Sequence, residues 1–161
     1  QCRDFPTMYS GTVGKNNENQ ISREEQVRVC NSVQNQLDKH PKKPKGRILL
    51  FLHSHEEHEL GLLICNYLFK EAQWETCYLG QNVPFEGLEI TYNLFQPDIT
   101  ITNIIKHLNE EEFNIVLKSI LRIIPEEKLM IGGKIALSYK EDIPTKIKIL
   151  EGFDDLKQTL V

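Results

Sequence analysis

The amino-acid sequence predicts an α/β fold in which a doubly wound sheet of five parallel strands is covered by helices on both faces. Short, almost uninterrupted apolar runs alternate with longer segments in which apolar residues recur at helical spacing. Continuous apolar runs are typical of parallel strands, because both faces of such a sheet are buried. The alternation of the two patterns is typical of crossover units, in which a helix connects each strand to the next parallel one.

The predicted elements follow one another from Arg47 to the end of the chain. Strands are expected, in order, over 47–53, 76–79, 99–102, 128–131 and 146–150. Helical segments are expected after them, over 58–72, 85–95, 110–123, 134–139 and from 154. The first of these helices has its apolar side chains on one face, at Leu60, Leu63, Ile64, Tyr67 and Leu68. This succession is typical of Rossmann-like and flavodoxin-like folds.

The residues before this pattern are predicted to form a separate appendage. Residues 1–38 begin with a polar stretch rich in Gly and Asn, and Ser22 to Glu25 has the Ser-x-x-Glu form of a capping box ahead of a short helix. Residues 39–46 belong to a basic cluster, KHPKKPKGR, whose two prolines oppose a helix, and we interpret them as a solvated linker. The α/β domain is expected to cover 47–161.

The composition is typical of a soluble globular protein, with 161 residues of which 40% are hydrophobic. The formal net charge of -4 argues against nucleic-acid binding by these residues, since such binding depends on clustered Lys and Arg. No apolar run approaches the roughly 18 residues of a membrane span, and the first residues do not resemble a signal peptide. A cytoplasmic protein is therefore expected, and its four widely spaced cysteines are expected to be reduced and structural.

Function is expected in the loops that follow the strands, because doubly wound sheets bind ligands beyond the carboxyl ends of their strands. The loop after the first strand contains His53, His55 and His58 within six residues. One interpretation is a zinc site, since this loop resembles the H-x-H-x-D-H signature of the metallo-β-lactamase superfamily. That fold is a larger β-sandwich and needs later ligands, for which only His40 and His107 remain. We therefore do not favour a hydrolytic zinc site.

The same loop contains Glu56-x-His58-x-x-Gly61, which resembles the D-x-H-x-x-G motif of cobalamin-binding domains, with Glu in place of Asp. The resemblance implies that His58 is the lower axial ligand of cobalt and replaces the cofactor's own base. It also implies that Glu56 accepts the other ring N–H and fixes the tautomer. Gly61 would let the nucleotide tail pass close to the backbone.

Further loops extend the resemblance over most of residues 45–137, and they are similar to those of the cobalamin-binding domains of MerR-type transcriptional regulators. The segment YLGQNVP resembles the second strand of that family and its loop. This match implies cofactor contacts at Gly80, Asn82 and Val83.

Two positions near the expected nucleotide complete the comparison with that family. Gly132-Gly133 matches the family's final G-G, where residues without side chains make room for the nucleotide. The family's Ser after the third strand, whose hydroxyl contacts the nucleotide base, is replaced here by Thr102 or by Asn103, depending on the register.

The appendage resembles the remnant of the helical bundle that covers the cofactor in light-sensing members of the family. Those members carry a W-x9-E-H motif, and here the Trp position falls at Lys15 or Asn16 and the His position at Gln26 or Val27. Trp74, the single tryptophan of the sequence, is predicted to be a packing residue instead.

The resemblance implies a cobalamin-binding sensor domain of a MerR-family transcriptional regulator, which is not an enzyme. DNA would be bound only through an N-terminal helix-turn-helix that the sequence does not include. The state of the cobalamin would shift a docking or oligomerisation equilibrium, which is compatible with a homo-oligomer. Two alternatives stay open: a corrinoid-carrying subunit of a methyltransferase or mutase, and an interaction domain of the same fold without the cofactor.

Overall fold

The computed structural model describes residues 41–160, and it confirms the predicted α/β class. The predicted appendage over 1–38 and the start of the predicted linker lie outside the described residues. The strands are β1 (Arg47–His53), β2 (Glu75–Val83), β3 (Ile99–Asn103), β4 (Leu129–Gly132) and β5 (Lys148–Leu150). The helices are α2 (Leu60–Glu71), α3 (Phe85–Phe95), α4 (Glu110–Leu121), α5 (Lys134–Ser138) and α6 (Asp154–Leu160), with short 3-10 turns η1 (Glu126–Lys128) and η2 (Lys140–Asp142).

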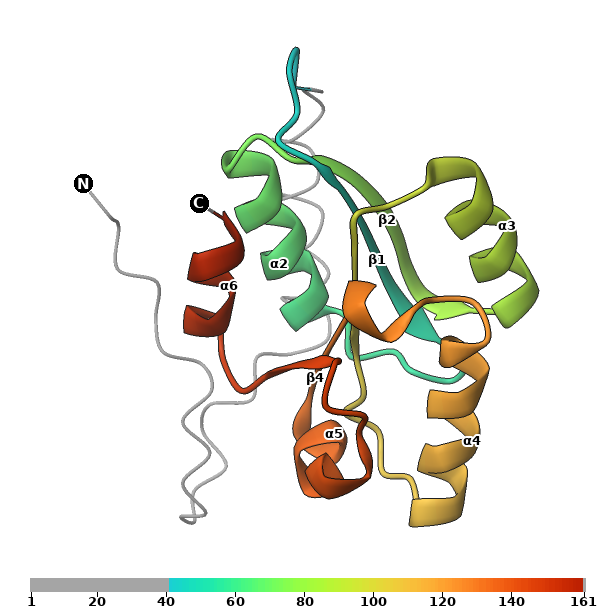
Figure 1. Ribbon diagram of the computed structural model, residues 1–161. Coiled ribbons are helices and arrows are strands. Elements are labelled where there is room, and N and C mark those ends of the chain that lie inside the picture. Colours follow the sequence, from blue (N-terminus) through green and yellow to red (C-terminus); the bar gives the residue numbers. More distant parts are fainter. Residues whose placement is uncertain (1–40, 161) are drawn as a thin grey trace.

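The strands form one parallel sheet in the order β2-β1-β3-β4-β5. The chain passes from β1 outwards to β2 and then returns to β3 on the other side of β1, so the strand order reverses between β1 and β3. Helices α2 and α6 lie on one face of the sheet, and α3 and α4 lie on the other (Figure 1). A reversal of this kind opens a crevice beyond the carboxyl ends of the two strands, which is the usual ligand site of such folds.

The central strand β1 separates two hydrophobic cores. Leu49 and Phe51 pack with the side chains of α3 and α4, whereas Ile48, Leu50 and Leu52 pack with those of α2 and α6. All five side chains are fully buried, and burial of such a side chain contributes about 1.5–3 kcal/mol. Because both faces of β1 are covered, the sequence of this strand shows no polar alternation.

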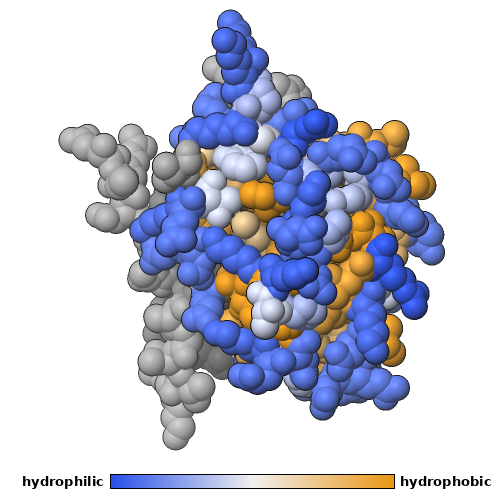
Figure 2. All heavy atoms as spheres, viewed as in Figure 1, coloured by the Kyte–Doolittle hydropathy of each residue, from blue (hydrophilic) through white to orange (hydrophobic). Residues whose placement is uncertain are grey.

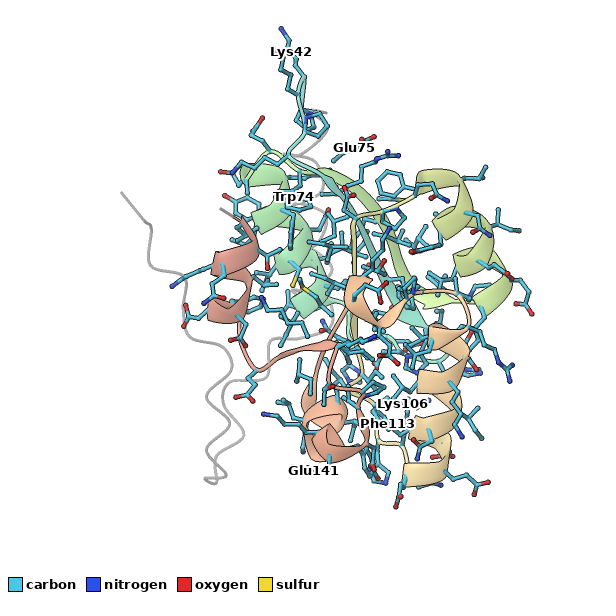
Figure 3. The ribbon with its side chains drawn as sticks, in the orientation of Figure 1. Lys42, Trp74, Glu75, Lys106, Phe113 and Glu141 are labelled. Atoms are coloured by element: carbon cyan, nitrogen blue, oxygen red, sulfur yellow. The ribbon has the colours of Figure 1, made fainter. Side chains whose placement is uncertain are left out.

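The predicted packing role of Trp74 is confirmed. Its ring meets Phe69 edge-on, with the ring centroids 5.3 Å apart, at the end of the sheet opposite to Lys106 (Figure 3).

Apolar atoms also reach the surface over α3 (Figure 2), a helix on which Ile90 and Leu94 are exposed. Single exposed apolar side chains are ordinary on a globular protein.

Several elements differ from the sequence prediction in their bounds, and two of these differences affect the candidate site. Strand β2 ends at Val83, four residues beyond the expected end. It continues through Gly80 and Asn82, which take positive φ angles of 76° and 57° where the register with β1 shifts. Helix α2 begins at Leu60, two residues later than expected, because the residues before it form the hydrogen-bonded loop described below. Helix α3 has the predicted bounds.

The described cysteines, Cys65 and Cys77, are free thiols, as predicted for these two residues. Burial raises the pKa of Cys65 to about 12, so this thiol stays protonated and chemically inert at neutral pH. Cys2 and Cys30 lie outside the described residues. Within residues 41–160, no helix is both long and apolar enough to span a membrane.

Candidate cofactor site at the carboxyl edge of the sheet

The carboxylate of Glu56 organises the loop that follows β1. The residue is fully buried. Its Oε1 accepts hydrogen bonds from the backbone N–H groups of Glu57 and His58, at 3.1 and 3.2 Å, and from Nδ1 of His58 at 2.6 Å. Its Oε2 accepts from the backbone N–H groups of Ile105 and Lys106, at 2.8 and 2.7 Å. The loop after β1 is thereby attached to the loop after β3.

These hydrogen bonds keep Glu56 ionised. Burial alone would raise its pKa, but the hydrogen bonds from Lys106, His58 and Ile105 outweigh burial and lower the pKa below its usual range. Glu56 is therefore a carboxylate at neutral pH, with acceptors for all of the donors that surround it.

His58 is held by this carboxylate in a defined orientation. Since an ionised carboxylate can only accept, the hydrogen in the 2.6 Å contact belongs to Nδ1 of His58. The lone pair of the neutral ring is then on Nε2. The side chain of His58 is 58% exposed, so Nε2 is available to a group outside the protein. The same pairing of carboxylate and imidazole orients histidines at metal centres.

The end of β2 is attached to the same loop through Asn82. Its Oδ1 accepts from the backbone N–H of His55 at 2.7 Å, and its backbone N–H donates to the carbonyl of Glu56 at 3.2 Å. Its Nδ2 donates to Oε1 of Glu57 at 3.3 Å. The neighbouring Val83 accepts from the hydroxyl of Ser54 at 3.3 Å. Asn82 and Val83, two of the three predicted cofactor contacts on this strand, therefore also stabilise the loop that presents His58.

Gly80 lies close to the start of α2. A Cβ atom at this position would be 3.2 Å from Oε1 of Glu59, and the φ angle of +76° also favours glycine. The same Oε1 accepts a hydrogen bond from the hydroxyl of Tyr78 at 2.7 Å. The positive φ angle is the main reason for glycine here, because the carboxylate is the end of a side chain that needs to shift only slightly to admit a Cβ atom.

The two candidate residues at the end of β3 point to opposite faces of the sheet. Ile101 packs in the core beneath α2, and Asn103, two residues later, faces the same side. Thr102 faces the other side, and its buried hydroxyl has no hydrogen-bond partner in the described part of the chain. Asn103, and not Thr102, therefore lies next to the other residues expected near the nucleotide.

The side chain of Asn103 lies between two of the predicted glycines. A Cβ atom on Gly61 would be 3.2 Å from its Nδ2, and a Cβ atom on Gly132 would be 2.6 Å from its Oδ1. Gly61 is at the start of α2, and Gly132 is paired with Asn103 in the ladder between β3 and β4. The amide of Asn103 thus occupies the space that side chains at these two glycines would need.

Gly133 has a different environment. Its φ angle is +101°, and a Cβ atom would be 2.8 Å from both N and C of Ile104. The Ile104 backbone is fixed there, since its N–H donates to the carbonyl of Gly132 and its carbonyl accepts from Ile135. Gly133 is therefore needed for close backbone packing, whatever its relation to a ligand.

Some of the residues that build this edge were not recognised in the sequence. The backbone donors of Ile105 and Lys106 are 49 and 50 positions away from Glu56, and backbone groups carry no signal in the side-chain pattern. The hydrogen bond between Tyr78 and Glu59 joins positions 19 apart. A tyrosine in an apolar strand opposite an acidic helix start was the only available signal for it.

The remaining histidines of the loop are not arranged around a common point. His53 is buried, with an Nδ1 atom that has no partner in the described part of the chain, whereas His55 is exposed. Among residues 41–160, no three His, Cys, Asp or Glu side chains are placed to share a metal ion.

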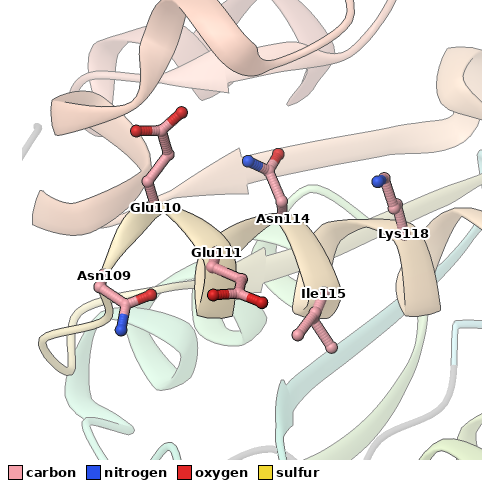
Figure 4. Close-up of a pocket in the computed structure, with 6 residues that line it drawn as sticks. All are labelled: Asn109, Glu110, Glu111, Asn114, Ile115 and Lys118. Carbon is pink, nitrogen blue, oxygen red and sulfur yellow. The ribbon is translucent and has the colours of Figure 1, made fainter.

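A hollow on the surface lies along α4, away from the residues predicted for the site. Glu110, Asn114 and Lys118 leave one side of the helix, and Glu111 and Ile115 leave another (Figure 4). Asn109 and Glu112 form a capping box at the start of this helix, so the acidic residues in its first turn have a structural role. None of the predicted cofactor contacts lines this hollow.

Comparison with known proteins finds a similar sequence and similar folds. No family model matches the chain. The chain is similar in sequence to the HTH-type transcriptional repressor CarA of Myxococcus xanthus, with 31% identity over 91 residues. The match covers 56% of this chain and 32% of the repressor, so the chain matches about a third of that relative's length.

Three solved structures have a similar fold. The first is a cobalamin-binding protein from Desulfitobacterium hafniense, with a TM-score of 0.51 and 15% identity over 86% of this chain and 70% of that protein. The second is the methanol:cobalamin methyltransferase complex MtaBC of Methanosarcina barkeri, with a TM-score of 0.51 and 16% identity over 69% of this chain and 44% of that one. The third is the monomethylamine corrinoid protein of Methanosarcina barkeri, with a TM-score of 0.55 and 12% identity over 84% and 64%.

The chain shares its fold with corrinoid proteins. Identities of 12–16% show the fold alone, because one fold can carry many functions. The similarity to a repressor is a similarity of sequence. Together they confirm the resemblance to the cobalamin-binding domains of MerR-type regulators.

Proposed function

We propose that this chain contains the cobalamin-binding sensor domain of a MerR-family transcriptional regulator. The observation that carries the proposal is the pair formed by Glu56 and His58 at the carboxyl end of β1. Its 2.6 Å hydrogen bond orients a half-exposed imidazole with Nε2 outward, at the point where the strand order reverses. An axial ligand of cobalt needs this arrangement.

The residues around this pair fit the remainder of such a cofactor. His58 would hold cobalt through its Nε2 atom. Asn103, which lies between Gly61 and Gly132, would supply a polar group to the nucleotide part of the cofactor. Gly80, Asn82, Val83 and Gly133 would complete the surrounding loops, whereas Thr102 faces the other side of the sheet. Bound cobalamin supplies a metal whose oxidation state and upper ligand can change, and hence a signal.

The regulator is preferred over a corrinoid-carrying subunit of a methyltransferase or mutase. Similarity to the corrinoid proteins of methyltransferase systems is a similarity of fold at 12–16% identity. Similarity to the repressor extends to the sequence, at 31% identity over 91 residues. In this proposal the domain is a sensor without catalytic activity of its own.

DNA binding is assigned in this proposal to a helix-turn-helix outside residues 1–161. The relative is an HTH-type repressor of which the match covers only 32%, and the sequence given has a net charge of -4. A change in the cobalamin would shift docking or self-association of the domain, provided that the two states differ in their contacts. Such a regulator works in the cytoplasm, where its DNA is.

The test is cobalamin retention by wild type, His58→Ala and His55→Ala, followed by visible spectra after gel filtration. His55 belongs to the same loop and is exposed, so its variant controls for general damage. Wild type and His55→Ala should retain cobalamin with the spectrum of imidazole ligation. His58→Ala should lose that spectrum and bind at least about tenfold more weakly.

Equal retention and equal spectra for wild type and His58→Ala would contradict the axial assignment. Absence of cobalamin from wild type itself would support the remaining alternative, an interaction domain that has the fold without the cofactor.

A further inference from the structure

The side-chain amide of Asn103 is a polar group whose hydrogen-bonding capacity is unused. Asn103 is only 8% exposed, and its amide makes no hydrogen bond with another described residue. A carboxamide has a separate donor, Nδ2, and a separate acceptor, Oδ1. The side chain is largely removed from water, but neither amide atom is among the fully buried atoms without a partner, so a ligand that arrives at this edge can still reach both. A ligand that covers the amide without pairing with it would leave it unsatisfied, which is costly.

The surroundings of the amide restrict where such a partner can come from. Nδ2 faces the backbone of Gly61, and Oδ1 faces the backbone of Gly132, with would-be Cβ positions at 3.2 and 2.6 Å. Neither glycine has a side chain to offer. A partner for the amide must therefore enter between the start of α2 and the end of β4.

We infer that Asn103 selects the corrinoid by its lower base, and that this chain prefers a corrinoid with an adenine base over one with dimethylbenzimidazole. The inference rests on the proposed function, because a base detached from cobalt by His58 must find a place in the protein. That place is bordered by Gly61, Asn103 and Gly132.

The preference follows from matching donors and acceptors. The edge of adenine presents an amine donor beside a ring-nitrogen acceptor, and a carboxamide pairs with both at once. Dimethylbenzimidazole presents a ring nitrogen and two methyl groups, so it can engage Nδ2 but leaves Oδ1 buried without a donor. An unsatisfied buried acceptor of this kind costs about tenfold or more in affinity.

Serine in place of Asn103 would remove the distinction. A hydroxyl concentrates its donor and acceptors on one rotating atom, so a single partner satisfies it and either base can supply that partner. Thr102, which faces the opposite side of the sheet, provides a matched control on the same strand.

The experiment measures equilibrium affinities of the whole chain for three corrinoids by visible absorbance. The corrinoids have an adenine base, a dimethylbenzimidazole base, or no nucleotide at all (cobinamide), with identical upper ligands. The proteins are wild type, Asn103→Ser and Thr102→Ser. Wild type and Thr102→Ser should prefer the adenine form about tenfold or more. Asn103→Ser should bring the two affinities close to each other, and all three proteins should bind cobinamide alike.

Equal affinities of wild type for the two bases, or a preference for dimethylbenzimidazole, would overturn the inference even if the variant failed to fold. An unchanged preference in Asn103→Ser would overturn it as well. Cobinamide separates the two levels of the argument. If wild type binds cobinamide without preference between the bases, the selection fails and the proposed function stands. If wild type binds none of the three, both fail.

Discussion

The loop after β1 and the ends of β3 and β4 lie at the same edge of the sheet, but they are held in place differently. In the loop after β1, a buried charged group, the carboxylate of Glu56, accepts hydrogen bonds at both oxygens. At the ends of β3 and β4, close packing of Gly133 on the backbone of Ile104 fixes the chain. The amide of Asn103 there makes no hydrogen bond with a described residue.

The two regions would therefore serve different tasks in the binding of one cofactor. The hydrogen bonds to Glu56 keep His58 in one orientation. Little conformational entropy is therefore lost when its Nε2 atom binds a metal. The amide of Asn103, which has no hydrogen-bond partner among the described residues, favours a ligand that supplies the missing hydrogen bonds. It can therefore discriminate between ligands. The first region supports binding of cobalt, and the second supports a choice among corrinoids.

The largest expected effect comes from breaking the packed region with Gly133→Ala. The new Cβ would lie 2.8 Å from N and C of Ile104, at a φ angle of +101°. Strain and overpacking together should lower the free energy of unfolding by about 4 kcal/mol, as measured by urea denaturation. Gly152→Ala is the control, since nothing lies within 4 Å of its Cβ position. Equal stability of the two variants would show that this turn is not tightly packed.

A somewhat smaller effect is expected from Glu56→Gln, which breaks the charged region. An amide cannot accept at both positions, so donors from His58, Ile105 or Lys106 lose their partner. The free energy of unfolding should fall by about 3 kcal/mol, and cobalamin affinity should fall at least about tenfold. Glu57→Gln, at an exposed neighbouring position, should change stability by less than about 1 kcal/mol. Similar losses in both variants would contradict the special role of the buried carboxylate.

Asn82 offers a milder test of the same loop. Asn82→Ala removes the hydrogen bonds to His55 and Glu57 and places a Cβ-bearing residue without a polar side chain at a φ angle of 57°. Its expected cost is about 1.5 kcal/mol in thermal or urea unfolding. Asn82→Gly tolerates that φ angle and should cost less. If the glycine variant were the less stable one, strain at the positive φ angle would not be a source of the loss in the alanine variant.

The smallest effect concerns His53 and the pH dependence of stability. Burial lowers the pKa of His53, with an opposing attraction from Glu56 and further repulsion from His55 and Lys106. The unfolded chain therefore takes up a proton at a higher pH than the folded one, and the free energy of unfolding falls as the pH drops below about 6.5. His53→Leu should be close to wild type in stability at pH 8 and should flatten this decline. His55→Gln serves as the control, and an equally steep decline in His53→Leu would exclude His53 as its source.

Most of the sheet could be predicted from the sequence because apolar periodicity reflects burial directly. The uninterrupted run of β1 and the helical spacing of α3 gave bounds that the structure shares. β2 was predicted too short because Gly80 and Asn82 usually mark a turn, whereas here their positive φ angles continue the strand through a shift of register.

The candidate site was only partly predictable. The spacing of Glu56 and His58 indicated their hydrogen bond, which is local. The donors from Ile105 and Lys106 were not predictable, because they are backbone groups brought close by the parallel pairing of β1 with β3. The choice between Thr102 and Asn103 required the direction of each side chain on β3. Gly132 and Gly133 looked equivalent in the sequence, yet one borders a side chain and the other a backbone.

The most direct test of the account is whether the nitrogen that binds cobalt belongs to the protein. The chain is prepared with ¹⁵N-labelled histidine, loaded with cob(II)alamin and examined by electron paramagnetic resonance. If Nε2 of His58 is the axial ligand, the superhyperfine pattern changes from triplets to doublets on labelling, and the axial-nitrogen splitting of the protein is lost in His58→Ala but kept in His55→Ala. Triplets that persist in the labelled wild type would show that the cofactor's own base still occupies cobalt, and would contradict the account.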